Sequence, residues 1–239
     1  MSEPLLILLL TVMAGAAIPV GGLLASFEHI RPQWLEHELR HFIIAFGGGI
    51  LLGAVAVVLV PEGVESMGGS MLAIPILLTG GIFFFLLERK MAAGGRQAPQ
   101  LIGMLSDYVP EAIALGGLMA AGSDSATLLA VLIALQNLPE GFNAFRELQR
   151  QNRSNRRTLL SMLALVPLGP IAGFSGFYLL AGQDYILGAI MLFASGGILY
   201  LLFQDIAPQS VLRKHWAPPL GAVFGFCLAL FSNMLTTHA

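Results

Sequence analysis

The amino-acid sequence predicts an all-α integral membrane protein with eight transmembrane helices. Three observations lead to this fold class. The 239 residues are 56% hydrophobic, with a mean hydropathy of +0.79. Only 11% of them are charged, whereas a soluble domain carries about 25% charged residues. The apolar residues also form runs long enough to cross a bilayer, which takes roughly 17–25 residues in a helix.

Eight such runs are present, and they are rich in Leu, Ala and Gly. They do not alternate between polar and apolar residues, which favours helices over a β-barrel. In chain order they cover residues 5–26, 41–61, 68–87, 101–121, 125–145, 158–181, 185–204 and 216–237. No connection is long enough for a soluble domain, so residues 1–239 are predicted to form a single transmembrane domain. The start "MSEP" lacks the basic residues of a secretory signal, so the first run is expected to be a retained helix.

The positive charges predict the orientation. All 12 Lys and Arg residues lie in or beside the connections that follow the first, third, fifth and seventh helices. Cytoplasmic connections are enriched in Lys and Arg, so these four face the cytoplasm and both termini are extracytoplasmic. The basic run "RQNRSNRR" (150–157) is then a cytoplasmic anchor beside helix ends and not a nucleic-acid-binding patch. The expected location is the cell (inner) membrane, with the lipid bilayer as partner and no nucleic acid.

Cysteine and glycine add two smaller points. The single cysteine, Cys227, excludes an intramolecular disulfide and a cysteine-rich metal site. Small residues four positions apart let helices approach closely in lipid. Such spacing predicts close helix contacts at Gly49/Gly53, Gly169/Gly173 and Gly221/Gly225.

Polar side chains interrupt the fourth and fifth helices. Asp107 and Glu111 are four residues apart and share a face of the fourth helix, as Gln136 and Glu140 do in the fifth. The short turn at 122–125 makes the two helices an antiparallel hairpin. Asp107 and Glu140 are equally distant in sequence from the centre of that turn, and so are Glu111 and Gln136. The four side chains are therefore expected to form two layers, about 6 Å apart at 1.5 Å per residue, in outline a cation site.

A proline lies within each pair, Pro110 in the fourth helix and Pro139 in the fifth. A proline inside a helix removes one hydrogen bond and releases the carbonyl four residues earlier, here that of Ser106 or Leu135. At membrane depth a released carbonyl is tolerated only where it faces protein or a wet cavity. Both carbonyls are therefore expected to face the same space as the polar side chains and to share in binding a cation.

The simplest alternative is that these polar groups only hydrogen-bond neighbouring helices and hold the bundle together. Three carboxylates in one region, however, need a cation, protons or a Lys or Arg partner. None of the eight apolar runs contains Lys or Arg. The charges therefore favour a pathway for cations or protons.

Further polar residues lie near the ends of the predicted helices. Glu62, at the outer end of the second helix, either collects cations on the way in or belongs to a solvated helix end that the preceding proline stops. Asp205, at the cytoplasmic end of the seventh helix, is an interfacial residue or lies on the way out. His41, with His29 and His37 before it, is either a solvated surface residue or a weak metal ligand on the cytoplasmic side.

Together these features resemble the ZIP (Zrt/Irt-like) divalent metal transporters. "DYVPEA" (107–112) is similar to the family's His-Asn-x-Pro-Glu-Gly motif in helix four, and "QNLPEG" (136–141) to its helix-five motif. "AGAAIPVGGLLA" in helix one and "GGILYLLFQDIAP" in helix seven support the match, which covers nearly the whole chain. The resemblance implies a 3+2+3 helix arrangement, a homodimer, and uptake of divalent cations such as zinc, iron or manganese. The metal is then cargo, so neither a cofactor nor an enzymatic activity is expected.

The sequence departs from the family pattern at a second metal site. Many members resemble a two-metal arrangement completed by an Asn in helix four, an acidic or amide residue in helix five and a Glu in helix six. Here these positions are Tyr108, Asn137 and Val166. The resemblance therefore implies one metal site, whose ligands are Asp107, Glu111, Gln136 and Glu140.

Asp107 also stands where the family has a His, so the implied site contains only oxygen donors. Carboxylate and amide oxygens shift preference from zinc towards harder ions such as Mn²⁺ or Fe²⁺. Three rival functions stay open at this point. The same carboxylates could serve a proton-coupled carrier of another solute, or the protein could be a structural scaffold. An intramembrane metal-dependent hydrolase is less favoured, because the sequence has neither H-E-x-x-H nor G-x-S-x-G.

Overall fold

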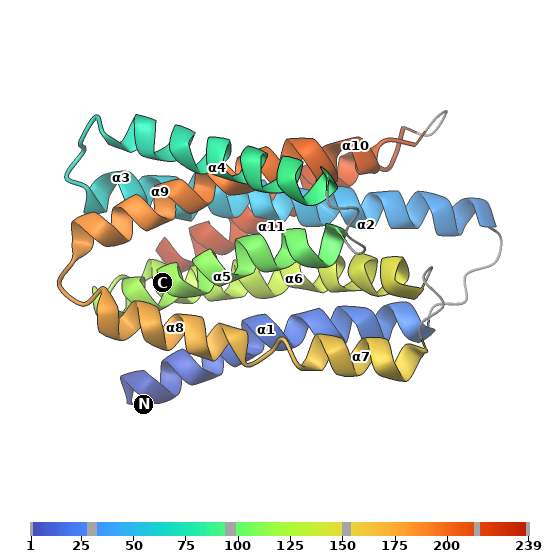
Figure 1. Ribbon diagram of the computed structural model, residues 1–239, viewed down its shortest axis with the longest axis horizontal. Helices are drawn as coiled ribbons and strands as arrows, with labels where there is room; N and C mark the ends of the chain where they lie inside the picture. The colour runs from blue at the N-terminus through green and yellow to red at the C-terminus, as the bar shows by residue number, and fades with distance from the viewer. Residues whose placement is uncertain (1, 28–32, 94–98, 150–153, 213–215, 238–239) are drawn as a thin grey trace.

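The computed structural model describes residues 2–27, 33–93, 99–149, 154–212 and 216–237, and the fold within these ranges is all-helical (Figure 1). The helices are α1 (Glu3–Phe27), α2 (Gln33–Ala54), the π-helix η1 (Val55–Leu59), α3 (Val60–Ser66), α4 (Ala73–Ala93), α5 (Pro99–Ala120), α6 (Ser125–Gln149), α7 (Asn155–Leu163), α8 (Leu168–Leu179), α9 (Asp184–Leu201), the π-helix η2 (Leu202–Ile206), α10 (Ala207–Ser210) and α11 (Leu220–Thr237).

Several of these elements follow one another directly and form longer helical segments. α2, η1 and α3 are continuous, as are α9, η2 and α10, while a short turn separates α7 from α8. The described ranges thus contain eight helices that run up and down the bundle, as predicted. Five segments are long and apolar enough to cross a membrane: Glu3–Phe27, Glu38–Ser66, Ser125–Gln149, Asn155–Leu179 and Asp184–Ser210. The protein is therefore a helical, multi-pass membrane protein.

Several helix boundaries differ from the predicted runs: the third helix is Ala73–Ala93 and not 68–87, and the seventh continues to Ser210 and not 204. Two further differences involve proline. The second helix does not stop at Pro61, because the chain continues as α3 to Ser66 with Pro61 in its first turn. The proline is tolerated because the π-helical turn η1 directly precedes α3, and such a local change of hydrogen-bond pattern can satisfy the backbone groups that a proline frees. The sixth helix, predicted as 158–181 without a break, is interrupted between Leu163 and Leu168. Pro167 lies in that gap, and a proline disfavours helical backbone geometry for the residue before it, here Val166.

Three short connections lie at one end of the bundle. This end, called here the turn end, contains the connections α3–α4, α5–α6 and α8–α9 together with the N-terminus (Figure 1). At the α5–α6 connection Gly122 has φ +70°, and the Ser123 N–H donates to the Leu118 carbonyl at 2.9 Å. This is a Schellman motif, in which a left-handed glycine ends the helix sharply. The glycine at position 122 thus allows the tight turn of the predicted hairpin.

The opposite end, called here the basic end, is where α1, α4, α6 and α10 end and where α2, α5, α7 and α11 begin (Figure 1). The described basic residues near it are Arg40, Arg89, Lys90, Arg146, Arg156 and Arg157. Arg31, Arg96, Arg150, Arg153, Arg213 and Lys214 lie outside the described residues. Alternation of the connections between the two ends agrees with the predicted topology. The assignment of the basic end to the cytoplasm stays a prediction.

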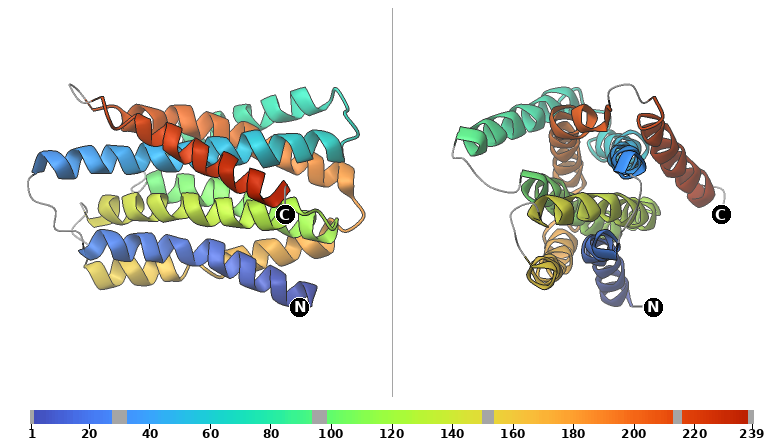
Figure 2. Two further views of the ribbon diagram at one scale, coloured as in Figure 1. Left: turned by 180° about the vertical axis from the view of Figure 1, so that it is seen from behind. Right: turned by 90° about the vertical axis from the view of Figure 1, so that its right-hand side faces the viewer.

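The α5–α6 hairpin lies in the middle of the bundle. It packs against α1 and α8 on one side and against α2 and α9 on the other, as the end-on view in Figure 2 shows. The most extensive contacts join helices far apart in the chain: α1 with α6, α2 with α11, α4 with α9 and α5 with α8. The hairpin that carries the polar motifs is therefore surrounded by other helices.

Glycines allow these helix pairs to approach closely. A Cβ on Gly141 would overlap the carbonyl oxygen of Ile18, and one on Gly21 would overlap that of Leu138, so α1 and α6 touch backbone to backbone. The predicted small-residue contacts are confirmed. Gly49, Gly53, Gly221 and Gly225 face the opposite helix across the α2–α11 contact, while Gly169 and Gly173 face Tyr108 and Thr11.

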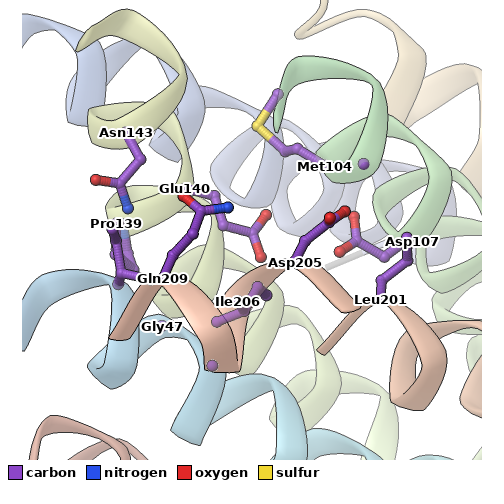
Figure 3. A pocket seen from close by; sticks show the side chains of 13 residues that line it. Gly47, Met104, Asp107, Pro139, Glu140, Asn143, Leu201, Asp205, Ile206 and Gln209 are labelled. Atoms are coloured by element: carbon purple, nitrogen blue, oxygen red, sulfur yellow. The ribbon is translucent and has the colours of Figure 1, made fainter. Parts of the chain in front are cut away.

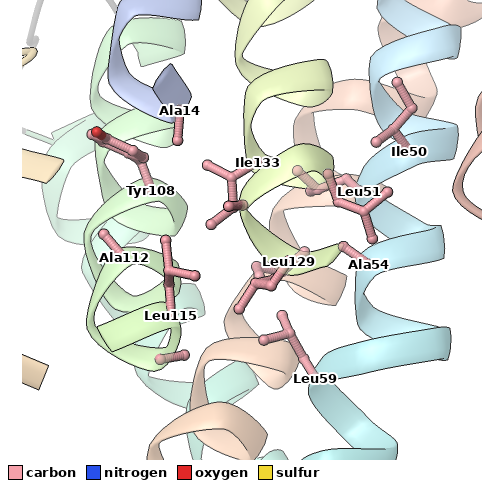
Figure 4. Close-up of a cluster of buried hydrophobic side chains, with 14 of the residues drawn as sticks. Ala14, Ile50, Leu51, Ala54, Leu59, Tyr108, Ala112, Leu115, Leu129 and Ile133 are labelled. Atoms are coloured by element: carbon pink, nitrogen blue, oxygen red, sulfur yellow. The ribbon is translucent and has the colours of Figure 1, made fainter. Parts of the chain in front are cut away.

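An apolar core closes the half of the hairpin nearer the turn end. Leu59 of η1, Leu115 of α5 and Leu129 of α6 are fully buried and belong to one cluster (Figure 4). Each lies between the polar motifs and the turn end. In this conformation the polar region is therefore sealed from the turn end by close-packed side chains.

Candidate cation site

Two helices bring the predicted ligands together. Asp107 and Glu111 project from α5, and Gln136 and Glu140 project from α6. Asp107 is 4% exposed, and Glu111 and Gln136 are fully buried. Glu140 as a residue is partly exposed, but both of its carboxylate oxygens are buried. Four oxygen-bearing side chains thus lie within the protein interior.

The layer nearer the turn end consists of Glu111 and Gln136. The Gln136 Nε2 donates a hydrogen bond of 2.6 Å to the Glu111 Oε2. This contact agrees with the level expected for the two residues from the centre of the turn. Their other oxygens, Glu111 Oε1 and Gln136 Oε1, are buried and have no hydrogen-bond partner among the described residues. The layer therefore presents two acceptor oxygens that lack a donor.

The layer nearer the basic end consists of Asp107 and Glu140. The Tyr108 backbone N–H donates to the Asp107 Oδ1 at 2.7 Å, while within the described ranges neither Glu140 oxygen has a hydrogen-bond partner. The Asp107 carboxylate interacts electrostatically with Glu140 and with Glu111, and Glu140 also interacts with Glu111. Like charges this close and out of water repel one another, so the region needs a cation or protons to balance it.

A cavity of about 50 Å³ adjoins this second layer on the side of the basic end. It has room for a few water molecules. Figure 3 shows Asp107 and Asp205 pointing toward one another across the cavity, with Glu140 pointing into it. The wall is formed by α2, α5, α6 and the α9–α10 segment, through Ile44, Gly47, Gly48, Gly103, Met104, Asp107, Pro139, Glu140, Asn143, Leu201, Asp205, Ile206 and Gln209.

Asp205 extends the polar region further toward the basic end. It belongs to the π-helix η2 and interacts with Glu88 of α4 and Glu147 of α6. A second cavity of about 30 Å³, lined by Glu88 and Ser106, shares Asp205 with the first. Asp205 is therefore part of the cavity wall and not only an interfacial residue. A place for Asp205 on the exit path of a cation stays a prediction. Its position in a π-helical turn is consistent with a functional role, because such turns are frequent at functional sites.

The carboxylates do not converge tightly in this conformation. Among the residues that the structure describes, no three side chains of His, Cys, Asp or Glu are placed so that they could hold a metal ion. The acidic groups instead surround a space large enough for water. A cation bound there would keep part of its water shell or would draw the carboxylates closer.

Glu62 contacts the α5–α6 turn. It is partly buried, and its Oε1 accepts hydrogen bonds from the hydroxyls of Ser123, at 3.3 Å, and Ser125. Glu62 is therefore not a solvated helix end, because it ties α3 to the α5–α6 turn. A role in collecting cations stays a prediction.

Glu62→Ala removes the acceptor of both serine hydroxyls. We expect a loss of about 1 kcal/mol, the net value of a hydrogen bond to a charged group that is still partly solvated. This corresponds to a fall of about 2–4 °C in the apparent melting temperature in detergent. Glu65→Ala, which changes an exposed carboxylate of the same helix, serves as control. Equal melting temperatures for the two variants would show that the link to the turn carries no stability.

The predicted histidine cluster receives no support. His41 lies in α2 and is partly exposed, but it is not part of the cavity wall. His29 and the side chain of His37 lie outside the described residues. His41, the one member of this cluster whose side chain is described, therefore adds no ligand to the cavity.

Tyr108 and Asn137 make contacts that hold helices together. The Asn137 Nδ2 donates to the Ala14 carbonyl at 2.9 Å, and the Tyr108 hydroxyl donates to the Thr11 carbonyl at 3.4 Å. Both side chains are fully buried. At these two positions the hairpin is therefore fastened to α1.

Three residues with polar side chains around the cavities were not selected from the sequence: Glu88, Asn143 and Gln209. Asn143 follows Glu140 by three residues and so shares its helix face, which is the one signal that could have pointed to it. Glu88 and Gln209 come from α4 and α10, and no spacing rule links them to the hairpin. No protein-family model and no curated protein sequence matches this chain, so its function has to be inferred from the chemistry of the site.

Proposed function

We propose that this protein takes up divalent transition-metal cations across the cell membrane through one oxygen-rich site between α5 and α6. The observation that carries this proposal is the group of three buried, mutually interacting carboxylates, Asp107, Glu111 and Glu140, beside a cavity. Ionisable groups within a membrane are costly and mark ion or proton pathways. Zinc, iron and manganese are the proposed cargo, and no cofactor or enzymatic step is required.

The resemblance to ZIP transporters supports this proposal and suggests the 3+2+3 arrangement with eight spans. The helix contacts fit it, because the contact of α1 with α6 is matched by that of α8 with α5, and the contact of α2 with α11 by that of α9 with α4. Each half also contains a π-helical turn that ends two residues before a proline, at Pro61 and Pro208. Related halves of this kind place the binding site between them. Assembly as a homodimer in the inner membrane, with the basic end in the cytoplasm, belongs to the same proposal.

The proposal assigns a single cation site, and the contacts of Tyr108 are its main support. In ZIP-like two-metal proteins the positions of Tyr108 and Asn137 would provide ligands. Here the Tyr108 ring occupies the space beside Gly15 and Gly169. The Asn137 Nδ2 is used in the bond to α1, while the Asn137 Oδ1 is buried and has no hydrogen-bond partner among the described residues. We therefore assign the cargo to the Asp107, Glu111, Gln136 and Glu140 region alone.

The function is tested by uptake into proteoliposomes that contain the purified protein. Zn²⁺, Mn²⁺, Fe²⁺, Cd²⁺ and Mg²⁺ are offered separately, and the lumen is monitored for both metal and pH. We expect accumulation of transition metals above the level of protein-free liposomes. Proton movement without flux of any metal would instead support the second candidate, a proton-coupled carrier that uses the same carboxylates.

Asp107→His tests the proposed preference for harder ions. An imidazole in place of one carboxylate favours zinc over manganese. We expect the ratio of zinc to manganese uptake to rise by roughly threefold to tenfold, which corresponds to about 1 kcal/mol of differential binding. Asp107→Asn, which retains an oxygen donor, should leave zinc without this advantage. An unchanged ratio in Asp107→His would remove the argument from donor type.

A further inference from the structure

Asn143 is a buried amide beside the proposed site. It lies on α6 three residues after Glu140, on the side of the basic end, and it is 5% exposed. Its side chain belongs to the wall of the 50 Å³ cavity that Asp107 and Glu140 also line (Figure 3). Its Oδ1 is buried and has no hydrogen-bond partner among the described residues.

An unpartnered amide oxygen at this depth requires an explanation. Buried polar atoms are nearly always hydrogen-bonded, and the requirement is stricter within a membrane, where no bulk water is available. Asn143 and Glu140 both line the 50 Å³ cavity. A water molecule or a hydrated cation in that cavity is the candidate for the missing partner.

The position is not matched on the other side of the site. In the equivalent "PEA" and "PEG" motifs, Asn143 follows Glu140 as Ala114 follows Glu111. Ala114 is fully buried, and its neighbour Leu115 belongs to the apolar core that seals the turn end. A side chain that could bind a cation thus follows Glu140 toward the basic end, whereas an alanine follows Glu111 toward the turn end. This asymmetry indicates a role in movement toward that end.

We propose that Asn143 binds the divalent cation as it leaves Glu140 toward the basic end and so sets the rate of its release. The inference rests on the proposed function. An amide oxygen is a hard ligand that suits the same cations as a carboxylate. It carries no charge, so it holds the cation less tightly and replaces part of the ligand set without trapping the ion. Asn143 is then a ligand of the release step, distinct from the four side chains that bind the cation first.

The experiment compares Asn143→Ala, Asn143→Ser and Asn143→Asp with the unchanged protein in proteoliposomes and in detergent. Initial rates of Mn²⁺ and Zn²⁺ uptake give the maximal rate, and equilibrium dialysis gives the affinity. We expect Asn143→Ala to lower the maximal rate about fivefold to tenfold while affinity changes less than twofold. Asn143→Asp should bind the cation about tenfold more tightly and also turn over more slowly. Asn143→Ser, which retains an oxygen, should recover part of the rate and shows that the loss in Asn143→Ala is not misfolding.

Two controls separate this inference from the proposed function. Asn233→Ala removes an amide from α11, outside the cavity wall, and should leave uptake unchanged. Glu140→Ala is measured in parallel. If the unchanged protein moves no metal, the proposed function fails, and the inference fails with it. If metal uptake depends on Glu140 but Asn143→Ala keeps the full maximal rate, the inference about Asn143 alone is overturned.

Discussion

Glu140→Ala is expected to reduce metal uptake to the level of protein-free liposomes. Glu140 places two buried carboxylate oxygens in the cavity region, and within the described ranges neither has a hydrogen-bond partner. Removing it takes away both a ligand and a negative charge that attracts the cation. Loss of residues that only support a metal ligand costs 10- to 100-fold in affinity or activity, so loss of a ligand should cost at least ~100-fold.

Glu111→Ala should have an effect of the same kind through a different contact. It removes the acceptor of the Gln136 Nε2 and so disorganises the layer nearer the turn end. Glu140→Gln separates charge from volume, because it retains an oxygen but no charge, and it should keep only a small fraction of the uptake. Glu65→Ala, which removes an exposed carboxylate of α3, controls for charge at the turn end. Metal uptake that is indifferent to both Glu111→Ala and Glu140→Ala would show that the cation crosses elsewhere.

Much of the arrangement could be predicted because it depends on local rules. The antiparallel hairpin follows from a short turn with Gly122, and the level of Glu111 with Gln136 follows from counting residues outward from that turn. Helix periodicity then places Asp107 and Glu140 one turn away on the same faces. These inferences need only the geometry of two adjacent helices, which the sequence specifies directly.

The remaining parts of the site depend on helices that are distant in the sequence. Asp205, Gln209 and Glu88 reach the cavities because α9, α10 and α4 pack beside the hairpin, and a single sequence contains no signal for that pairing. The prediction that the second helix stops at Pro61 is wrong for another reason. A proline reads as a helix stop, yet the preceding π-helical turn lets the chain continue as a helix through it.

The seal on one side and the cavity on the other give the site a direction. Leu59, Leu115 and Leu129 close the path to the turn end, while the cavity adjoins Glu140 on the basic side. The hydrogen bonds from Ser123 and Ser125 to Glu62 hold the closed end together. A cation arriving from the turn end would therefore require this end to open. The hairpin would have to move against α3 or against the helices beside it.

Gly141→Ala adds only one methyl group, yet it should destabilise the protein strongly. Gly141 follows Glu140 directly, and a Cβ there would overlap the backbone carbonyl oxygen of Ile18 in α1. A backbone carbonyl cannot rotate away as a side chain can, so α1 and α6 would have to separate. Such overpacking costs about 1–3 kcal/mol or more, and we expect the apparent melting temperature in detergent to fall by about 5–10 °C.

Gly103→Ala provides a matched control for this effect. Gly103 also lies within a helix, α5, but a Cβ at this position would meet no atom within 4 Å. Because Ala is the better helix former, by roughly 1 kcal/mol, the same substitution should leave stability unchanged or raise it. Opposite shifts of the two variants would tie the loss in Gly141→Ala to the α1–α6 contact. A Gly141→Ala protein as stable as Gly103→Ala would mean that α1 does not lie against α6 at Ile18, and the position of Glu140 would then need to be reconsidered.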